Sequence, residues 1–207
     1  MHPKIFQEFE KIFATREITG SVLEIGAVPS DGSLLCMKSL RNAREKIGIN
    51  LDGPFEFKDF RIIKGNANRM NCFEDNSFDA VISNATLEHD KYFWLSIEEI
   101  KRVTRPGGLI VIGVPGFRPL GAEKIRDAIK RIRLFRKPRS SSLMHALFTA
   151  TITFRVHAAP GDYYRFSPQA LLEVFFEGMS DVELRSVMVP PIIIGSGIKI
   201  SGASVRQ

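Results

Sequence analysis

The sequence predicts an α/β fold, in which a mainly parallel sheet carries helices on both faces. Three observations lead to this prediction. Apolar runs of strand length alternate with segments of helical period. The run LIVIGV at 109–114 is apolar throughout, as expected of a strand that is covered on both sides. A length of 207 residues, with 44% hydrophobic and 25% charged residues, suits one folded domain and argues against a disordered chain.

The first half of the chain supplies five strands with helices between them. Asp31 or Ser33 can cap a helix that follows the first strand and runs through Leu40. A second helix is expected over 92–103, and the sequence Arg-Pro-Gly-Gly at 105–108 ends it and turns the chain. The expected strands are 22–25, 47–51, 60–63, 78–82 and 109–114.

The alternation stops after Pro115. A basic stretch at 118–139 and a largely apolar stretch at 143–156 follow, and we expect one domain over 1–207 with a basic helical insertion at about 117–156. Ser167 and the proline after it are typical of a helix start. Two closing strands are expected at 182–189 and 192–201. Only a Pro-Pro turn separates them, so they should pair antiparallel.

The stretch SVLEIGAVPSDG at 21–32 has the layout of a nucleotide-binding corner, with a buried strand, a glycine turn and a helix start. Glycine allows the backbone to approach a ligand without a Cβ in the way. A dinucleotide site needs the pattern G-x-G-x-x-G, so that a pyrophosphate can lie on the helix N-terminus. Here Gly26 is followed by Val28 and Ser30, which argues against NAD and FAD.

Six motifs in order resemble those of the class I S-adenosylmethionine-dependent methyltransferases, and of the small-molecule, type 11-like branch in particular. Each motif alone is weak, but together they fit the pattern of strands and helices. The resemblance runs from about Ser21 to the C-terminus without the insertion, and implies a Rossmann-like fold with a seven-stranded sheet. The motifs are VLEIG at 22–26, GINLD at 48–52, GNA at 65–67, DNSFDAVI at 75–82, TLEH at 86–89 and RVTRPGGL at 102–109.

The resemblance implies an S-adenosylmethionine site, with S-adenosylhomocysteine as the product and no metal. Glu24 and Gly26 would line the methionine end of the cofactor. Asn50 stands where an acid usually binds the ribose, and Asn66 where an aspartate usually binds the adenine amino group. The expected cofactor-binding residues are Glu24, Gly26, Ala27, Asn50, Leu51, Asn66, Ala67, Asn84, Ala85 and Leu87, of which the last three would lie over the sulfonium.

The chain departs from the family pattern at this corner. Two glycines are replaced by Val28 and Ser30, and two acids by Asn50 and Asn66. The neutral side chains remove hydrogen bonds that would otherwise be charge-assisted. An alternative therefore stays open: a non-catalytic member of the fold that binds a nucleoside-type ligand, or a partner through its basic insertion. For Gly26 alone, the alternative is a plain tight turn.

The expected reaction is methyl transfer to oxygen or nitrogen of a small-molecule, glycan-linked or lipid-linked acceptor. The protein then mainly positions the acceptor and excludes water, and an oxygen acceptor also needs a base, for which histidine is suited. The candidates are His89, His157 and Tyr164. The stretch HAAPGDYYRFSP at 157–168 resembles a motif of family members. Its structural alternative is an Asp162–Arg165 pair, packed tyrosines and a helix cap at Ser167.

The positive charge is concentrated in one segment. The net charge is +6, and the nine Lys and Arg against two acids within 118–139 give +7 there and −1 elsewhere. The segment can be a lid helix with a solvated face, a site for an anionic glycan or lipid acceptor, or a peripheral contact with an anionic membrane. Nucleic acid is not expected as a partner, because no basic and aromatic strand platform is present.

A cytoplasmic location is expected. The N-terminal stretch is amphipathic and charged, without the apolar core of a signal peptide, and no apolar run is long enough to span a bilayer. The cysteines Cys36 and Cys72 have no metal-ligand spacing, and we expect two buried thiols.

Overall fold

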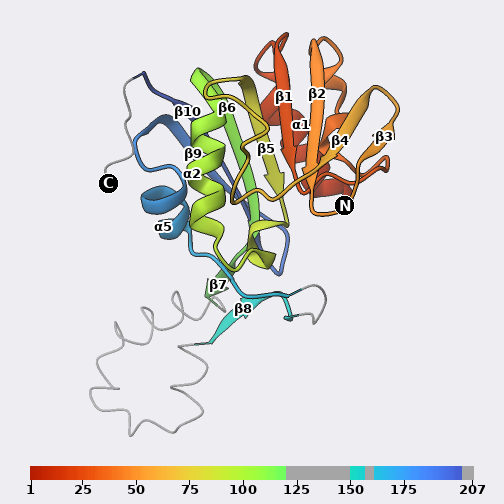
Figure 1. Ribbon diagram of the computed structural model, residues 1–207. Helices are drawn as coiled ribbons and strands as arrows, with labels where there is room; N and C mark the ends of the chain where they lie inside the picture. The colour runs from red at the N-terminus through yellow and green to blue at the C-terminus, as the bar shows by residue number, and fades with distance from the viewer. Residues whose placement is uncertain (120–149, 157–160, 202–207) are drawn as a thin grey trace, which may run out of the picture.

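In the computed structural model, which describes residues 1–119, 150–156 and 161–201, the chain forms one large sheet with helices on both faces (Figure 1). Five neighbouring strands run parallel, as the sequence predicts. The order in the sheet is β3-β4-β2-β1-β5-β6-β10-β9. The strands are β1 (Ser21–Ile25), β2 (Glu45–Asn50), β3 (Phe55–Phe57), β4 (Phe60–Lys64), β5 (Phe78–Asn84), β6 (Thr104–Pro115), β9 (Met179–Val187) and β10 (Ile192–Lys199).

The sheet has eight strands where seven were expected. The additional strand is β3, a three-residue edge strand that pairs antiparallel with β4. The turn at Lys58 has a positive φ of 52°, which reverses the chain directly after β3. The antiparallel pairing of β9 with β10 confirms the prediction for the two closing strands. A second, two-stranded sheet joins β7 (Phe117–Pro119) to β8 (Thr151–Thr153) at the end of β6.

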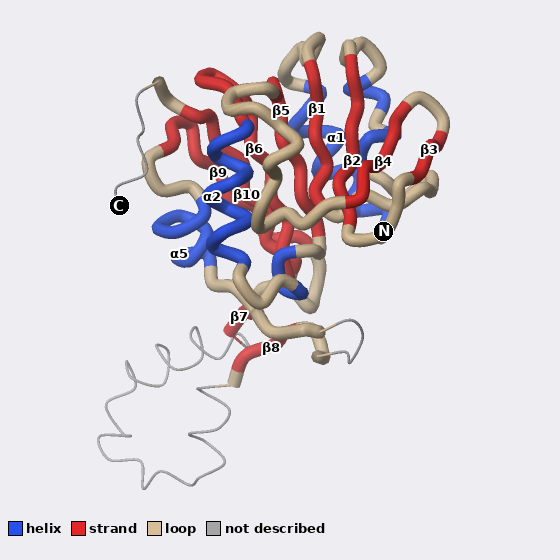
Figure 2. The backbone as a smooth tube through the Cα atoms, viewed as in Figure 1, coloured by secondary structure: helices blue, strands red, loops and turns tan. Residues whose placement is uncertain are grey.

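Two helices lie on opposite faces of the sheet, α1 (Pro3–Ala14) on one and α2 (Phe93–Val103) on the other (Figures 1 and 2). Successive side chains of a strand point to opposite faces, so each strand contributes side chains to the hydrophobic core on both faces of the sheet. Val22 of β1 packs in the cluster that contains the buried side chains of α1, and Leu23 packs in the cluster that contains those of α2. This arrangement confirms the prediction that helices cover both faces.

The helix expected after β1 is absent, and that prediction is wrong. The chain instead makes two 3₁₀ turns, η1 (Leu34–Cys36) and η2 (Lys38–Leu40), separated by Met37 in an extended conformation. Two contacts hold the turns against the sheet. Glu24 of β1 accepts hydrogen bonds from the first backbone amides of η1, and Glu10 of α1 accepts one from the amide of Ser39. The apolar face of α1 packs in the same cluster as Leu34, Leu35 and Leu40.

Two smaller expectations also need correction. The turn expected at 105–108 is an irregularity within β6, since the pairing with β5 jumps from Phe78–Thr104 to Ala80–Leu109. Of the two thiols expected to be buried, Cys36 is partly buried and Cys72 is exposed. The predicted helix start is confirmed: the hydroxyl of Ser167 accepts a hydrogen bond from the amide of Ala170, at 3.0 Å, and α5 (Pro168–Ala170) continues as a π turn, η5 (Leu171–Phe175).

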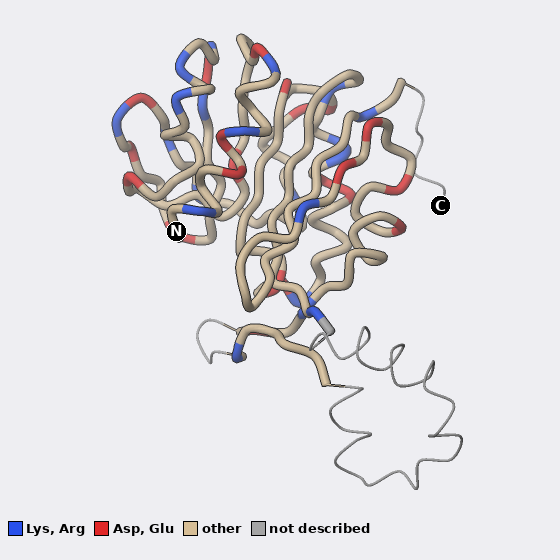
Figure 3. The backbone as a smooth tube through the Cα atoms, turned by 180° about the vertical axis from the view of Figure 1, so that it is seen from behind, with Lys and Arg blue, Asp and Glu red and all other residues tan. Residues whose placement is uncertain are grey.

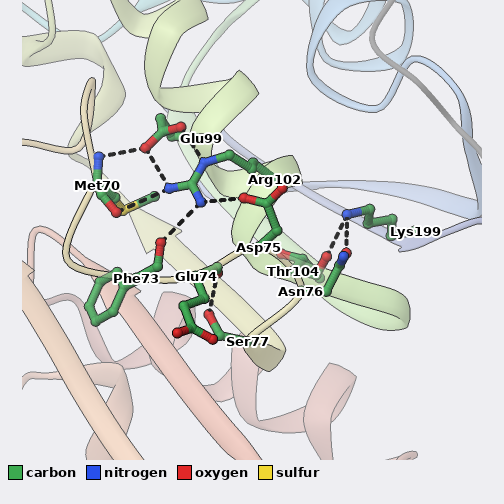
Figure 4. Close-up of polar contacts among 10 residues, drawn as sticks. All are labelled: Met70, Phe73, Glu74, Asp75, Asn76, Ser77, Glu99, Arg102, Thr104 and Lys199. Atoms are coloured by element: carbon green, nitrogen blue, oxygen red, sulfur yellow. Dashed lines mark hydrogen bonds and ion pairs between the residues drawn. The ribbon is translucent and has the colours of Figure 1, made fainter.

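Arg102 at the end of α2 holds the irregular segment between β4 and β5 (Figure 4). Its guanidinium binds the carboxylates of Glu99 at 2.6 Å and Asp75 at 2.7 Å. It also donates to the carbonyl oxygens of Phe73 and Met70, each at 3.0 Å. A planar fork can satisfy all four partners at once, which a single ammonium group cannot do. The segment is therefore fixed to α2 although it forms no helix of its own.

No helix in the described part of the chain is long and apolar enough to cross a bilayer. Within the same residues, no cluster of His, Cys, Asp and Glu is arranged to hold a metal ion.

We expect Arg102→Ala to lower the free energy of unfolding by about 2–3 kcal/mol, because several hydrogen bonds to charged or carbonyl groups are lost together. Arg102→Lys should recover only part of the loss, since lysine lacks the fork. Urea denaturation measures both. Arg41→Ala is the control, because Arg41 is exposed and its side chain makes no ion pair within the described residues. Equal losses for Arg102→Ala and Arg41→Ala would contradict this account.

Candidate active site

The carboxyl ends of β1, β2, β4 and β5 bring four of the expected motifs, VLEIG, GINLD, GNA and TLEH, to one edge of the sheet. β1 lies between β2 and β5, with Ile25 opposite both Ile49 and Ser83. Strand order reverses at β1, and this is the point at which open α/β sheets bind ligands. The backbone closes the edge: the amide of Gly26 donates to the carbonyl of Ile49 at 2.9 Å, and that of Gly65 to the carbonyl of Asn50 at 2.8 Å.

Gly26 is required by a contact within the protein. Its φ is +76°, a conformation that disfavours any other residue. A Cβ at this position would lie 2.3 Å from Oγ1 and 2.7 Å from Cγ2 of Thr86. The plain tight turn weighed for this glycine therefore explains its presence without a ligand. The contact also joins the turn after β1 to the loop after β5.

Glu24 is buried beneath the same turn. Its carboxylate accepts hydrogen bonds from the hydroxyl of Ser33 and from the amides of Leu34, at 3.1 Å, and Leu35, at 3.4 Å. Burial raises its pKa above the ordinary value, and these hydrogen bonds act in the opposite direction. In a dinucleotide site the first amides after the turn bind pyrophosphate. Here the carboxylate of Glu24 accepts hydrogen bonds from these amides. This agrees with the replacement of two motif glycines by Val28 and Ser30.

The ends of β2 and β4 carry the two asparagines expected near the ribose and the adenine. The Asn50 side chain donates to the carbonyl of Ala27 at 2.8 Å and accepts from the amide of Asp52 at 3.2 Å. Asn66 accepts from the amide of Asn68 at 2.9 Å. Asn66 thus stabilises its own turn, and Asn50 joins its turn to the one after β1. Leu51 is different, because 68% of its surface is exposed and available to a flat ring.

The remaining expected cofactor residues differ in exposure. Ala27 and Leu87 are buried in the core, and Ala67 is half-buried. Ala85 has a positive φ of 50° at the end of β5. The side-chain oxygen of Asn84 is buried and accepts no hydrogen bond from any described residue. A buried acceptor without a donor at the end of β5 and an exposed leucine after β2 are the kinds of group that suit a ligand with polar hydrogens and a flat ring, such as S-adenosylmethionine.

Two of the three catalytic candidates come together beyond β5. His89 ends the short turn η3 (Leu87–His89), and its Nδ1 contacts the carbonyl oxygen of Gly161. The hydroxyl of Tyr164 donates to the carbonyl of Lys91 at 2.9 Å. The third candidate, His157, lies outside the described residues, as does most of the predicted lid.

The structural alternative for the 161–167 loop is confirmed in most respects. Asp162 is fully buried and forms a two-pronged ion pair with Arg165, with Nη2 and Oδ2 2.7 Å apart. The ring of Tyr164 packs against Phe93 with 5.0 Å between centroids. Tyr163, in contrast, is 55% exposed. The Asp162–Arg165 pair therefore holds the loop together, and the ring of Tyr164 packs against α2. A catalytic role for Tyr164 stays a prediction.

Glu88 is a candidate functional residue that sequence reasoning missed. Its side chain is only 4% exposed, and Oε1 lies 3.9 Å from Nε2 of His89. Oε2 is buried and accepts no hydrogen bond from the described residues. Burial raises the pKa of the carboxyl to about 7, against the opposing effects of His89 and Arg165. The available signal was an acid between the buried Leu87 and a histidine, directly after the fourth predicted strand.

Two cavities of about 460 Å³ each lie outside the corner. The first is at the amino ends of the strands, between the end of α1 and residues 38–42. The second adjoins the end of β6, and its walls include Phe117, Arg118 and Ile193.

A parallel sheet whose order reverses at a glycine turn, with polar side chains following the strand ends, defines a class of proteins that bind nucleotide-type ligands. Within that class, residues 32–112 match the family model described as a methyltransferase domain. No curated protein sequence matches the chain.

Several solved structures with a similar fold are methyltransferases. Phosphoethanolamine N-methyltransferase 2 of Haemonchus contortus matches at 13% identity with a TM-score of 0.61, over 95% of this chain and 52% of that one. The 1,6-didemethyltoxoflavin N1-methyltransferase of Burkholderia thailandensis matches at 14% identity with a TM-score of 0.62, over 95% of this chain and 78% of that one. The N-methyltransferase NodS of Bradyrhizobium japonicum matches at 11% identity with a TM-score of 0.58, over 94% of this chain and 85% of that one. All three were solved with S-adenosylhomocysteine.

These findings confirm the resemblance to class I methyltransferases and the predicted Rossmann-like fold. They also support the prediction of an enzyme that uses S-adenosylmethionine. The chain spans about half the length of the Haemonchus protein, at 52%. The motif at 22–26 lies before the stretch that matches the family model.

We expect Gly26→Ala to lower the free energy of unfolding by about 2–4 kcal/mol, from the positive φ together with the clash against Thr86. The double variant Gly26→Ala/Thr86→Ala should recover part of that loss. Urea denaturation of the two single variants and the double variant gives the coupling energy, which should exceed about 1 kcal/mol. Strict additivity would show that Thr86 is not what excludes a side chain at residue 26.

A second expectation concerns Glu88 and pH. Its pKa is raised from 4.5 to about 7 in the folded protein. The folded state then binds the proton more tightly than the unfolded chain, so stability falls as pH rises between these values and is level above them. Relative to Glu88→Gln, the wild type should lose on the order of 3 kcal/mol of unfolding free energy between about pH 4.5 and pH 7.

Urea denaturation at about pH 5 and about pH 8 measures this difference. Glu98→Gln is the matched control, because Glu98 is an exposed acid on α2 and should show no such dependence. A constant difference between wild type and Glu88→Gln at the two pH values would contradict the raised pKa.

Proposed function

We propose that the protein is an S-adenosylmethionine-dependent methyltransferase acting on a small-molecule, glycan-linked or lipid-linked acceptor. The observation that carries this proposal is the meeting of the motif residues at one edge. Gly26 follows β1, and Asn50 and Asn84 end the strands β2 and β5 that pair with β1 on either side. Asn66 follows β4, whose last residue pairs with Asn50. The match to a methyltransferase domain over 32–112 supports the same conclusion.

Different residues at the carboxyl edge of the sheet would bind different parts of the cofactor. Leu51 offers an exposed apolar surface for the adenine, and Asn66 a polar group beside it. Asn84 offers a buried acceptor near the junction of β1 and β5. The bound cofactor supplies an activated methyl group. The protein's part is to orient the acceptor, exclude water and accept a proton.

Nitrogen is the favoured acceptor atom. The three similar structures named above carry N-methyltransferase titles, and the first two were solved with phosphomonomethylethanolamine and 1,6-didemethyltoxoflavin. At 11–14% identity these neighbours show the fold, and their substrates are a guide to the size of the acceptor. We infer that the second cavity, at the end of β6 and beside Phe117, receives the acceptor.

An anionic acceptor group remains part of the proposal. Figure 3 shows Lys and Arg interspersed with Asp and Glu along the described part of the chain. The excess of positive charge belongs to 118–139, and only Arg118 of its Lys and Arg lies in the described part. Arg118 is exposed and lines the second cavity, where it can meet a phosphate or carboxylate. A cytoplasmic location and a peripheral membrane contact stay predictions.

A second candidate is a non-catalytic member of this fold. The contact of Thr86 with Gly26 favours it, because the protein itself uses the space above the glycine. The two candidates differ in whether the corner binds S-adenosylmethionine.

Isothermal titration calorimetry with S-adenosylmethionine, S-adenosylhomocysteine and NAD tests the proposal. We expect micromolar binding of the first two and none of NAD, because the amides that would hold a pyrophosphate are bound by Glu24. Leu51→Asp should weaken binding at least tenfold without loss of stability. Leu172→Asp is the control, since Leu172 is 47% exposed on η5. Absence of binding would establish the non-catalytic alternative.

A further inference from the structure

A buried carboxyl lies directly behind the histidine of the acceptor site. Glu88 and His89 are neighbours in η3, at the end of the loop that follows β5. The Glu88 side chain is 4% exposed and that of His89 is 17% exposed. A molecule that approaches from solvent therefore reaches the imidazole and not the carboxyl.

The imidazole is held by its inner nitrogen. Nδ1 of His89 contacts the carbonyl oxygen of Gly161, which can only accept a hydrogen bond, so Nδ1 carries the hydrogen in the neutral ring. Nε2 is then the basic nitrogen. It lies 3.9 Å from Oε1 of Glu88, which is close enough for the negative carboxylate to stabilise a positive imidazolium.

The position of Glu88 is fixed by its backbone. Its carbonyl oxygen accepts hydrogen bonds from the amides of Tyr163, at 2.8 Å, and Tyr164, at 3.3 Å. The charged groups that act on its carboxyl from the facing loop are Asp162 and Arg165, which neutralise each other in their ion pair. His89 is thus the group left to set the charge of Glu88, and the remaining oxygen, Oε2, is buried without a donor.

We propose that Glu88 is a positioning residue of the acceptor site, which stabilises the proton that His89 takes from the methyl acceptor. This inference rests on the proposed function. The N–H or O–H bond of the acceptor breaks, and its proton passes to Nε2 of His89. The electron pair left on the acceptor forms the bond to the methyl carbon, and the carbon–sulfur bond breaks with its pair on sulfur. The ionised Glu88 offsets the charge gained by His89.

The raised pKa of Glu88, about 7, agrees with this role, because a group that titrates near neutral pH can respond to the charge of its neighbour.

The coupling is measured without cofactor or acceptor. Carboxyl ¹³C NMR of Glu88 should give a titration midpoint near 7 in the wild type. In His89→Gln the midpoint should rise by about one pH unit, because the imidazolium no longer stabilises the carboxylate. His2→Gln, at the N-terminal end, is the control. An unchanged midpoint in His89→Gln would overturn the proposal.

The second readout is the pH profile of methyl transfer to a set of primary amines. Glu88→Gln should lower kcat about 10- to 100-fold with little change in KM, and should remove the pH-dependent limb near neutrality. Glu98→Gln should behave as the wild type. A Glu88→Gln enzyme with an unaltered pH profile would overturn the proposal. If the wild type binds no S-adenosylmethionine, the proposed function fails, and the NMR titration still decides whether Glu88 and His89 are coupled.

Discussion

The buried carboxylate of Glu24 is the constraint on which the corner depends. It projects from the central strand β1. It accepts hydrogen bonds from the first backbone amides of η1 and from the Ser33 hydroxyl. Left without an acceptor, these buried donors would each cost free energy comparable to a lost hydrogen bond. Because Glu24 satisfies them, the segment can stop after a single 3₁₀ turn. The N-terminal helix α1 packs with these turns on the sheet face, and the first amides of η1 are already bound by Glu24.

Arginines hold irregular segments at both edges of the sheet, one at the amino end of β5 and one at the carboxyl end of β6. Arg102 binds the segment that leads into β5, and Arg165 binds Asp162 in the loop that covers the end of β6. Both arginines also donate to backbone carbonyls, so they replace secondary structure where the chain is irregular. Asn84 and Glu88, at the carboxyl end of β5 and in the loop after it, are among the residues with unsatisfied buried oxygens. The supporting residues are thus distinct from those available to ligands.

Most of the sheet could be predicted from sequence because strand signals are local. The apolar run at 109–114, the Pro-Pro turn before β10 and the cap at Ser167 each depend on a few neighbouring residues. The predictions were wrong where contacts with residues distant in the sequence determine the local structure. The helix after β1 is lost to contacts with Glu24 and α1, and the need for glycine at residue 26 comes from Thr86, sixty positions along the chain. Glu88 was missed because a raised pKa follows from burial by a loop that no sequence motif announces.

The place of β1 between β2 and β5 has a consequence for synthesis on the ribosome. Four strands, β1 to β4, leave the ribosome before β5, yet one edge of β1 is completed only when β5 pairs with it. Every residue of β1 is buried in the finished sheet. A nascent chain therefore exposes an apolar strand edge for the time needed to add some sixty residues, roughly 3 to 12 seconds at bacterial and eukaryotic elongation rates. Exposed edges of this kind pair with other chains. Chaperone binding to the nascent chain would shield this edge until residue 84 has emerged.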